Sequence, residues 1–339
     1  MSRRVSLKDI AQQLGISRTT VSWVLSGLGD ERHISKETQD KVVKLAHELD
    51  YKPNLLAKAL RTGDNKVIGL IVPDIEDQFY SEISKSVECE AYKRGYTITL
   101  GTSESQKEKE SALIQLFRNK LIDGLIIAPT KYSKEDITGL LEQQFPLVLF
   151  DRYFKELDTD YVITDDEYSG YMLTRHLLEK GCRKIATINI NKHLDVTQQR
   201  IAGYRRALTE SGIGVNQDLI ADVEFATYRS DVVGALDSIF EKVPDVDGFL
   251  FITHIIAIEA ITYFSEHGMD YNNTFHMGCV HEVPMMKVVA PKMSIALMPT
   301  AEIGRQAVDF LLAGINNRKN GNCTHTQSVK LKTKLIYRD

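Results

Sequence analysis

Residues 6–25 read SLKDIAQQLGISRTTVSWVL, and this stretch predicts two short helices joined by a tight turn. Ser6 and Asp9 have the spacing of a capping box at the start of a helix. Apolar residues then recur on one helical face: Leu7, Ile10, Ala11 and Leu14. Gly15 ends that helix, and Ser17 is placed to cap a second one over 18–25. Two helices joined in this way predict a helix-turn-helix, the motif whose second helix enters the major groove of DNA.

A third helix is predicted beyond a loop that contains Gly27 and Gly29. Ser35 is placed to start this helix. Its buried face would carry Val42, Leu45, Ala46 and Leu49, with lysines on the opposite face. The inward-facing residues of the second helix would be Val21, Val24 and Leu25. Residues 1–52 therefore predict a compact all-α head, and the short run LLAKALR follows at 55–61.

Three stretches of the chain carry a resemblance to a known family. They are SLKDIAQQLGISRTTVS (6–22), ISKETQDKVVKLAHELDYKPN (34–54) and LAKALRTGDNKVIGLIVPD (56–74). In these stretches the chain closely resembles the lactose-repressor/galactose-repressor (LacI/GalR) family of bacterial transcriptional regulators, and the resemblance continues at lower density to a predicted final strand at 330–338. It implies a helix-turn-helix DNA-binding domain (1–52), a hinge helix and linker (53–65), and an effector-binding, dimerising core (66–339).

Charge is unevenly distributed along the chain. Residues 1–63 contain 11 Lys and Arg against 7 Asp and Glu, a net charge of +4, while the other 276 contain 31 against 39, a net charge of −8. A basic head on an acidic body suits attraction to phosphate at one end. The four cysteines show no pairing pattern, which indicates reduced thiols. No signal peptide or membrane-length apolar run is recognisable, so we expect a soluble cytoplasmic protein with no membrane partner.

From residue 66 onward, strand-sized apolar runs alternate with helix-length segments. The predicted strands are 67–72, 97–101, 124–128, 147–150, 161–164, 184–190, 248–252 and 276–279. The predicted helices are 79–94, 107–121, 167–180, 197–211, 229–242 and 255–267. This alternation predicts parallel sheets covered by helices on both faces, with enough repeats for two doubly wound α/β lobes.

The resemblance implies a periplasmic-binding-protein-like core in which the chain crosses between the lobes three times. Lobe 1 would comprise about 66–164 plus 298–323, and lobe 2 about 165–297 plus 324–339. The alternative is a single Rossmann-type enzyme. However, no GxGxxG follows 67–72, and the chain contains no GxxxxGK[ST], HExxH or GxSxG. We therefore expect neither enzymatic activity nor a cofactor.

Base contacts are expected on the outward face of the second helix, where the resemblance places Arg18, Thr19 and Trp23. Arg18 can form paired hydrogen bonds to guanine. Trp23 departs from the family, which commonly has arginine or histidine there, and an indole with one donor cannot make a bidentate contact. Trp23 either contacts DNA or packs against the neighbouring helix. The hydroxyls expected at phosphates, or alternatively as caps and surface groups, are Ser17, Thr20 and Ser22.

The run at 55–61 is too short to form a stable helix alone in water. The resemblance implies that it folds against its twin from a second subunit, with Leu60 wedged between base pairs in the minor groove. The other hinge residues assigned to DNA are Asn54, Ala57, Lys58 and Arg61. The alternative is an amphipathic linker packed on the body. A hinge that needs its twin implies a homodimer on a pseudo-palindromic operator, and a chain that ends after its last strand favours a dimer over a tetramer.

The resemblance also assigns residues to an effector cleft between the lobes. In lobe 1 these are Asp77, Phe79, Tyr80 and Arg152, and in lobe 2 they are Arg200, Phe225, Thr253 and His254. The chain departs from the family at two of its usual acidic positions. Thr253 and His254 stand where the family usually has an aspartate that binds ligand hydroxyls, and 278–281 read GCVH instead of a glycine-aromatic-aspartate-aspartate string.

Replacement of that acid leaves Arg152, Arg200 and His254 as the expected charged residues of the cleft. We therefore expect an anionic effector such as a uronic acid or sugar phosphate, with a neutral sugar, a purine or no effector as alternatives. His254 could instead be a helix N-terminal residue without ligand contact. No metal is expected, because His254, Cys279, His281 and Glu282 have irregular spacing. These features predict an effector-controlled repressor of carbohydrate-use genes; the competing class is a solute-binding protein or enzyme on the same lobes.

Overall fold

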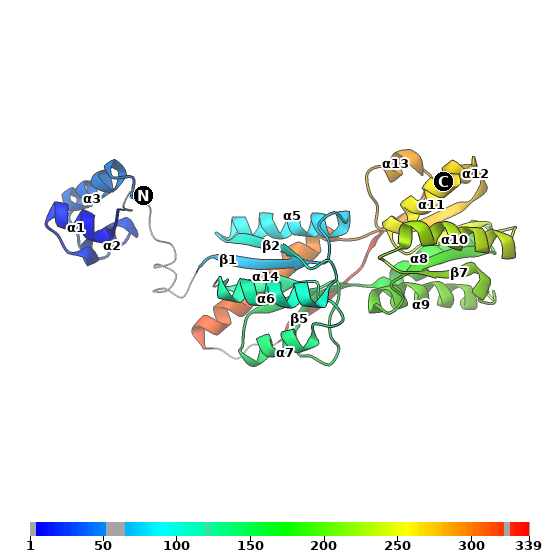
Figure 1. The fold of residues 1–339 in the computed structure, drawn as a ribbon, viewed down its shortest axis with the longest axis horizontal. Helices are drawn as coiled ribbons and strands as arrows, with labels where there is room; N and C mark the ends of the chain where they lie inside the picture. The colour runs from blue at the N-terminus through cyan, green and yellow to red at the C-terminus, as the bar shows by residue number, and fades with distance from the viewer. Residues whose placement is uncertain (1–4, 52–64, 121, 322–325, 339) are drawn as a thin grey trace. The chain divides into compact units, whose positions relative to one another are not determined.

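The computed structural model describes residues 5–51, 65–120, 122–321 and 326–338. Contacts between residues divide the chain into two units, Met1–Asn65 and Lys66–Asp339, and each is described by itself (Figure 1). The hinge residues to which the sequence assigns DNA contacts, Asn54, Ala57, Lys58, Leu60 and Arg61, lie outside the described residues. No helix among the described residues is long and apolar enough to cross a membrane.

The head contains the three predicted helices, α1 (Leu7–Leu14), α2 (Arg18–Leu25) and α3 (Lys36–Glu48). The capping box is present: Asp9 N–H donates to Ser6 Oγ (3.4 Å), and Ser6 N–H donates to the Asp9 carboxylate (2.8 Å). Gly15 ends α1 at a φ of 64°, in the left-handed region that favours glycine. Local sequence signals thus fix where these helices begin and end.

A small apolar cluster holds the three helices together. Its buried members are Ile10, Ala11, Val21, Val24, Val42 and Ala46. Leu25, Leu45 and Leu49, which the sequence places in this core, are only partly buried at its edge. Burying a large aliphatic side chain contributes roughly 1.5–3 kcal/mol, so this cluster orients α2 with few residues. The opposite face of α2 carries no core residue and is free for other contacts.

Two six-stranded sheets form the core (Figure 1). The first has the order β11-β5-β4-β3-β1-β2, with parallel pairings throughout. Its strands are β1 (Val67–Val72), β2 (Thr97–Thr102), β3 (Gly124–Ile127), β4 (Leu147–Phe150), β5 (Asp160–Thr164) and β11 (Ser328–Leu331). The second has the order β12-β10-β9-β8-β6-β7, in which only β12 runs antiparallel to its neighbour. Its strands are β6 (Ile185–Ile190), β7 (Ile220–Val223), β8 (Gly248–Phe251), β9 (His276–Val280), β10 (Ser294–Leu297) and β12 (Lys334–Ile336).

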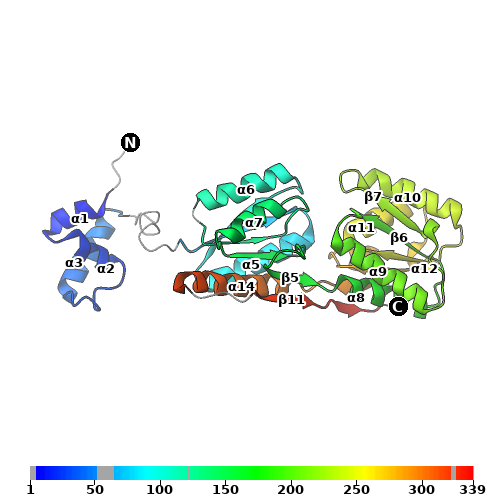
Figure 2. The ribbon, with the colours of Figure 1, turned by 90° about the horizontal axis from the view of Figure 1, so that it is seen from below.

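Helices cover both faces of each sheet (Figure 2). Those of the first lobe are α5 (Gln78–Lys93) and α14 (Thr300–Asn320) on one face, and α6 (Lys107–Asn119) and α7 (Lys134–Glu142) on the other. Those of the second lobe are α8 (Asp166–Glu179) and α9 (Asp195–Glu210) on one face, and α10 (Tyr228–Lys242) and α11 (His254–Glu266) on the other. The second lobe also contains three short helices: η1 (Gln217–Leu219), α12 (Tyr271–Thr274) and α13 (Met286–Val289). Coverage on both faces explains why central strands such as β1, VIGLIV, are apolar at nearly every position.

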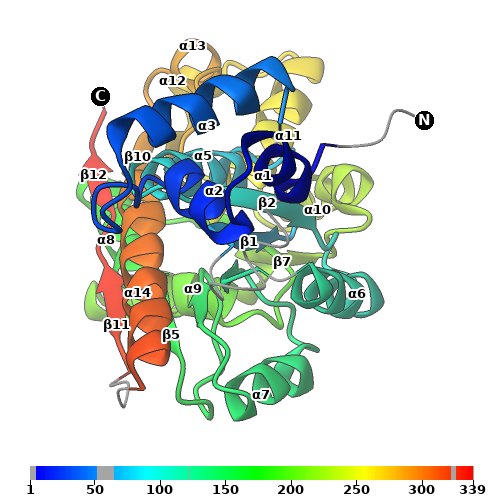
Figure 3. The ribbon, with the colours of Figure 1, turned by 90° about the vertical axis from the view of Figure 1, so that its left-hand side faces the viewer.

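The last predicted strand, 330–338, is in fact two strands that serve different sheets. β11 pairs with β5 in the first sheet, and β12 pairs with β10 in the second, so the predicted assignment of all of 324–339 to lobe 2 is wrong. Figure 3 shows the two strands, coloured red, following one another along one edge of the core. The chain crosses between them at 332–333, because one extended segment is long enough to reach both sheets. The strands β7 and β10 and the helices α7 and α14 were also not predicted.

Helices α8 and α9 pack unusually closely, because glycines stand where they touch. A Cβ atom on Gly170 would lie 2.1 Å from the carbonyl oxygen of Arg200, and one on Gly203 would lie 2.1 Å from that of Glu167. Real side chains cannot approach so closely, so both positions require glycine. This close packing brings the Arg200 side chain to the start of α8, where it meets Asp166.

Candidate functional sites: the outward face of α2 and a cavity between the lobes

The outward face of α2 carries the residues that the sequence assigns to base and phosphate contacts. Arg18 and Thr19 are exposed, and Ser22 and Trp23 are half-buried. Ser17 acts as the helix cap, since its Oγ accepts from Thr20 N–H (2.9 Å) and lies 2.8 Å from Thr20 Oγ1. The capping alternative for Ser17 and Thr20 is therefore what the structure contains, and their phosphate contacts stay a prediction.

Trp23 is half-buried but lies outside the apolar cluster of the head. Among residues 5–51, the apolar cluster does not include Trp23, which argues against the alternative that it packs on a neighbouring helix. The Arg32 guanidinium lies over its ring instead, 5.1 Å from the ring centroid. Trp23 therefore supports a charged side chain at the surface rather than the core.

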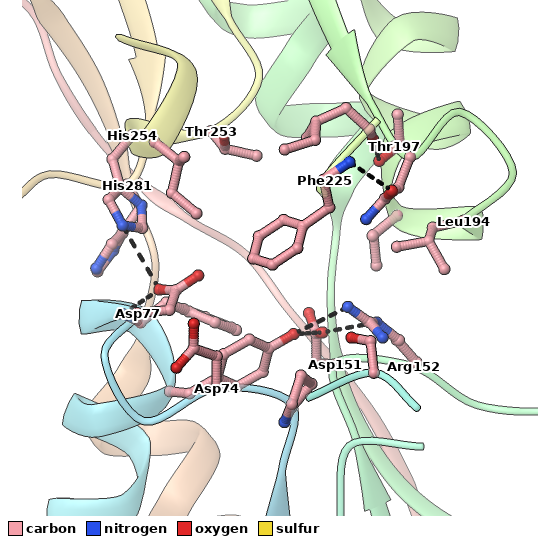
Figure 4. A pocket seen from close by; sticks show the side chains of 18 of the residues that line it. Asp74, Asp77, Asp151, Arg152, Leu194, Thr197, Phe225, Thr253, His254 and His281 are labelled. Carbon is pink, nitrogen blue, oxygen red and sulfur yellow. Dashed lines mark hydrogen bonds and ion pairs between the residues drawn. The ribbon is translucent and has the colours of Figure 1, made fainter. Parts of the chain in front are cut away.

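A cavity of about 350 Å³ lies between the lobes, and all eight residues predicted for the effector cleft line it. They are Asp77, Phe79, Tyr80, Arg152, Arg200, Phe225, Thr253 and His254. Figure 4 shows Asp77 and Asp151 facing lobe 2, with the Phe225 ring projecting into the space between. The cavity lies at the carboxyl ends of the strands, where doubly wound sheets bind their ligands. A volume of this size falls within the range of small-molecule sites.

The lobe 1 wall is held by a hydrogen-bonded network. Tyr80 Oη donates to Asp151 Oδ2 (2.7 Å), and Arg152 Nη2 donates to Tyr80 Oη (3.3 Å). Arg152 Nε lies 3.5 Å from the same Asp151 oxygen and makes no hydrogen bond, although it is buried. Asp77 caps α5 by accepting from Phe79 N–H (2.8 Å). The wall thus presents carboxylate oxygens and a partly engaged guanidinium in a fixed arrangement.

Arg200, on the lobe 2 wall, is bound through two of its nitrogens within its own lobe. Its Nε donates to Asp166 Oδ1 (2.7 Å), and its Nη1 donates to the carbonyl oxygen of Ile252 (2.8 Å). The side chains of Arg200 and Asp166 are only 9% and 5% exposed. The positive charge of Arg200 is therefore compensated before any ligand enters.

His254 lies at the first position of α11, directly after the capping residue Thr253, and faces Asp77 across the cavity. The distance from His254 Nε2 to Asp77 Oδ1 is 3.5 Å. Burial lowers the pKa of His254 to about 3, and burial raises the pKa of Asp77 to about 6. At pH 7 this contact therefore joins a neutral imidazole to a carboxylate and is not an ion pair.

His281 also lines the cavity, and its signal in the sequence is the unusual string GCVH at 278–281. It is 3% exposed, its φ is 68°, and neither ring nitrogen has a hydrogen-bond partner. Its ring centroid lies 5.3 Å from that of His254. Burial lowers the pKa of His281 as well. The cavity therefore holds two adjacent neutral imidazoles, one of them without a hydrogen-bond partner.

Carboxylates outnumber arginines along the cavity. The acidic lining residues are Asp74, Glu76, Asp77, Glu104 and Asp151. The expectation that Arg152, Arg200 and His254 are the charged residues of the cleft is therefore wrong. Of the five acids, only Asp77 was assigned to the cleft from the sequence; the others follow β1, β2 and β4. Within the described residues, no group of three or more His, Cys, Asp or Glu side chains could hold a metal ion.

Comparison with known proteins matches both units. The model of the family described as "Periplasmic binding proteins and sugar binding domain of LacI family" matches residues 65–338, and that of "Bacterial regulatory proteins, lacI family" matches residues 6–54. The ribose operon repressor of Haemophilus influenzae is 29% identical over 313 residues, which are 92% of this chain and 92% of that protein.

Solved structures share the fold. The lac repressor dimer bound to operator and the anti-inducer ONPF has a TM-score of 0.84 at 20% identity, covering 99% of this chain and 98% of that one. The complex of the transcriptional regulator CelR with cellobiose has a TM-score of 0.70 at 24% identity, covering 99% of each chain.

Proposed function

Because the chain belongs to the LacI family of bacterial regulatory proteins, we propose that the cavity between its lobes holds the small molecule that controls DNA binding by its head. One observation carries this assignment of the site: a single cavity collects polar and aromatic side chains from both lobes. A ligand that contacts both lobes binds their closed arrangement more tightly than their open one, and so shifts the population toward closure.

The head binds operator DNA through α2, and the regulator acts as a homodimer. Support comes from the family model over 6–54 and from the exposure of Arg18 and Thr19 on α2. Two-fold symmetry of the dimer calls for a pseudo-palindromic operator. Coupling from the cavity to DNA through the hinge would change operator affinity 5- to 150-fold for a typical coupling of roughly 1–3 kcal/mol.

The effector we favour is a neutral polyhydroxylated sugar rather than an anion. Carboxylates such as Asp77 and Asp151 accept hydrogen bonds from sugar hydroxyls but repel another carboxylate. Each arginine of the cavity already lies beside a carboxylate, Arg200 beside Asp166 and Arg152 beside Asp151. The neutral His254 and His281 can each donate and accept a hydrogen bond, and the face of Phe225 suits a sugar ring. The first family description names a sugar-binding domain, which agrees with this choice.

A solute-binding protein or an enzyme on the same lobes is the competing class. Neither class explains a helix-turn-helix head whose second helix, α2, has an outward face without core residues. Retardation of DNA by the full-length protein separates the classes. We expect a palindrome selected from a random library to be bound by the full chain and not by residues 66–339 alone. Equal binding of all DNA sequences, unaffected by any sugar, would contradict a regulator.

Calorimetry on the full-length protein tests the effector class with four probes: ribose, cellobiose, glucuronate and glucose 6-phosphate. We expect heat of binding from a neutral sugar and none from the two anions. Asp77→Asn should weaken that binding about 10-fold or more, since a hydrogen bond to a charged acceptor is lost. Glu135→Gln, an exposed carboxylate on α7 outside the cavity, is the matched control and should bind as the parent does. Binding of the anions alone would reject the neutral sugar but leave the regulator function intact.

A further inference from the structure

The loop between α2 and α3 is held in one conformation by backbone hydrogen bonds. Leu28 N–H donates to the carbonyl oxygen of Trp23 (2.9 Å), and Arg32 N–H donates to that of Leu28 (3.0 Å). Ile34 N–H then donates to the carbonyl oxygen of Gly29 (2.9 Å). These bonds fold the loop back onto the end of α2 and so fix the position of the Arg32 backbone.

Side chains of α3 lock the same loop. Gln39 Nε2 donates to Asp30 Oδ1 (2.9 Å) and to the carbonyl oxygen of Ile34 (2.8 Å), and Lys36 Nζ donates to Asp30 Oδ2 (2.8 Å). A Cβ at Gly29 would lie 2.4 Å from Gln39 Cδ, so a side chain there would displace Gln39 from this network. The Asp30 carboxylate thus faces α3, where it accepts hydrogen bonds from Lys36 and Gln39, and it does not pair with Arg32.

The Arg32 side chain lies exposed over the half-buried ring of Trp23. Within residues 5–51 its guanidinium makes no hydrogen bond or ion pair, and it contacts the face of the indole. An arginine stacked on an aromatic ring keeps its N–H donors free in the guanidinium plane. The stack also limits the side-chain freedom that a contact would otherwise have to remove. The Arg32 guanidinium is therefore positioned by the Trp23 ring, and its N–H groups can donate hydrogen bonds to a ligand.

Trp23 stands on the outward face of α2, four and five residues after Thr19 and Arg18. Residues four apart, such as Thr19 and Trp23, are neighbours on one face of a helix, whereas Arg18 is about 140° away from Trp23 around the helix axis. The guanidinium above Trp23 consequently extends the face of α2 that carries Thr19. Trp23 alone offers a single donor, but the pair of Trp23 and Arg32 offers the planar fork that an arginine at position 23 would have supplied.

We propose that Arg32 reads a guanine base of the operator, with the Trp23 ring as the platform that positions it. This inference rests on DNA binding by the head, and it adds a loop residue to the reading surface of α2. Arg32 would donate two hydrogen bonds to O6 and N7 of one guanine in each half-site. Trp23 is a positioning residue, which acts on the base through Arg32.

Selection of binding sites from a library of randomised palindromes tests the proposal on the full-length protein. The variants are Arg32→Gln, Arg32→Lys, Trp23→Leu and Trp23→Phe, with Lys44→Gln as the control. Lys44 is exposed on α3, and its replacement removes one positive charge, as Arg32→Gln does. Circular dichroism melts establish that each variant is folded.

We expect the parent to require guanine at one symmetric pair of positions. Arg32→Gln should lose about 5- to 150-fold of that preference while the other positions stay unchanged. Arg32→Lys keeps the charge but lacks the fork, so it should lose preference too. Trp23→Leu should lower the same preference, and Trp23→Phe should retain most of it.

Two results would overturn the proposal, and they can be told apart. A uniform loss of affinity in Arg32→Gln and Lys44→Gln, with the selected sequence unchanged and restored by Arg32→Lys, would mean that Arg32 contacts only phosphate. A parent protein that selects no sequence at all would instead refute sequence-specific DNA binding by the head.

Discussion

Arg200 should be a structural residue of the second lobe rather than a ligand contact, and Arg200→Met tests this. In the parent, its charge is paired with Asp166 at 2.7 Å, and both side chains are almost fully buried. Without Arg200, Asp166 keeps only the hydroxyl of Thr164, 3.1 Å away, and the carbonyl of Ile252 loses its side-chain donor. Breaking a buried ion pair on one side typically costs about 3–5 kcal/mol, because a charge stays buried without compensation.

The double variant Arg200→Met/Asp166→Asn removes both charges together. We expect it to be within about 1–2 kcal/mol of the parent, and thus more stable than Arg200→Met, because no uncompensated charge remains. Urea unfolding at one fixed protein concentration, followed by circular dichroism, measures these differences. Trp23 is the only tryptophan and lies in the head, so its fluorescence reports head unfolding separately and should not change.

Arg200→Met would refute this reasoning if its free energy of unfolding stayed within about 1 kcal/mol of the parent. Loss of sugar binding in such a stable variant would then assign Arg200 to the ligand. In that case the anionic effector would regain its main support, since the arginine would have been free to hold a negative group.

Four further predictions concern His254, Asp77, the glycines of the core and the cap of α1. Burial lowers the pKa of His254 to about 3, so protonation favours the unfolded chain. The stability contribution of the neutral His254 is therefore present above pH 6.5 and lost as the pH falls toward 3. Urea midpoints of His254→Gln should fall less steeply over this range than those of the parent. The raised pKa of Asp77, about 6, has the opposite sign, and Asp77→Asn should gain stability above pH 6 but not below pH 4. Gly170→Ala should destabilise the core by roughly 1–3 kcal/mol or more through its 2.1 Å approach to the Arg200 carbonyl, whereas Gly234→Ala on α10, with no atom within 4 Å, should stabilise it by up to about 1 kcal/mol in the same melts. Ser6→Ala removes the cap of α1 and should cost about 0.5–2 kcal/mol of head stability, read by Trp23 fluorescence; an unchanged midpoint would show that the capping box is not needed.

The head could be predicted almost completely from the sequence, because its signals are local. Ser6, Gly15, Ser17 and Ser35 each mark a helix end through hydrogen bonds or backbone conformation within a few residues. What the sequence could not give is the partner of Trp23. Arg32 meets it only because Gly29 and Gln39 fold the loop back, and that return depends on packing between α3 and the loop.

In the core, the alternation of apolar runs and helical segments predicted the two doubly wound lobes, because each long strand is recognisable from its own composition. The short strands β7 and β10 were not predicted, because four residues at a sheet edge or before a crossover carry too little pattern. The division of the last strand into β11 and β12 also escaped, because the two sheets that it joins are formed by distant segments.

The residues that line the cavity were recognisable in the sequence through the family resemblance, and all eight meet in one cavity. Their charge state was not. The sequence identified eight side chains of the cavity, whereas the tertiary structure added His281 and four further carboxylates. It also decided that Arg200 is paired with Asp166 and that burial keeps His254 and His281 neutral. The physical reason is that electrostatics depends on burial and on partners brought from distant segments, and neither is written in the local pattern of the chain.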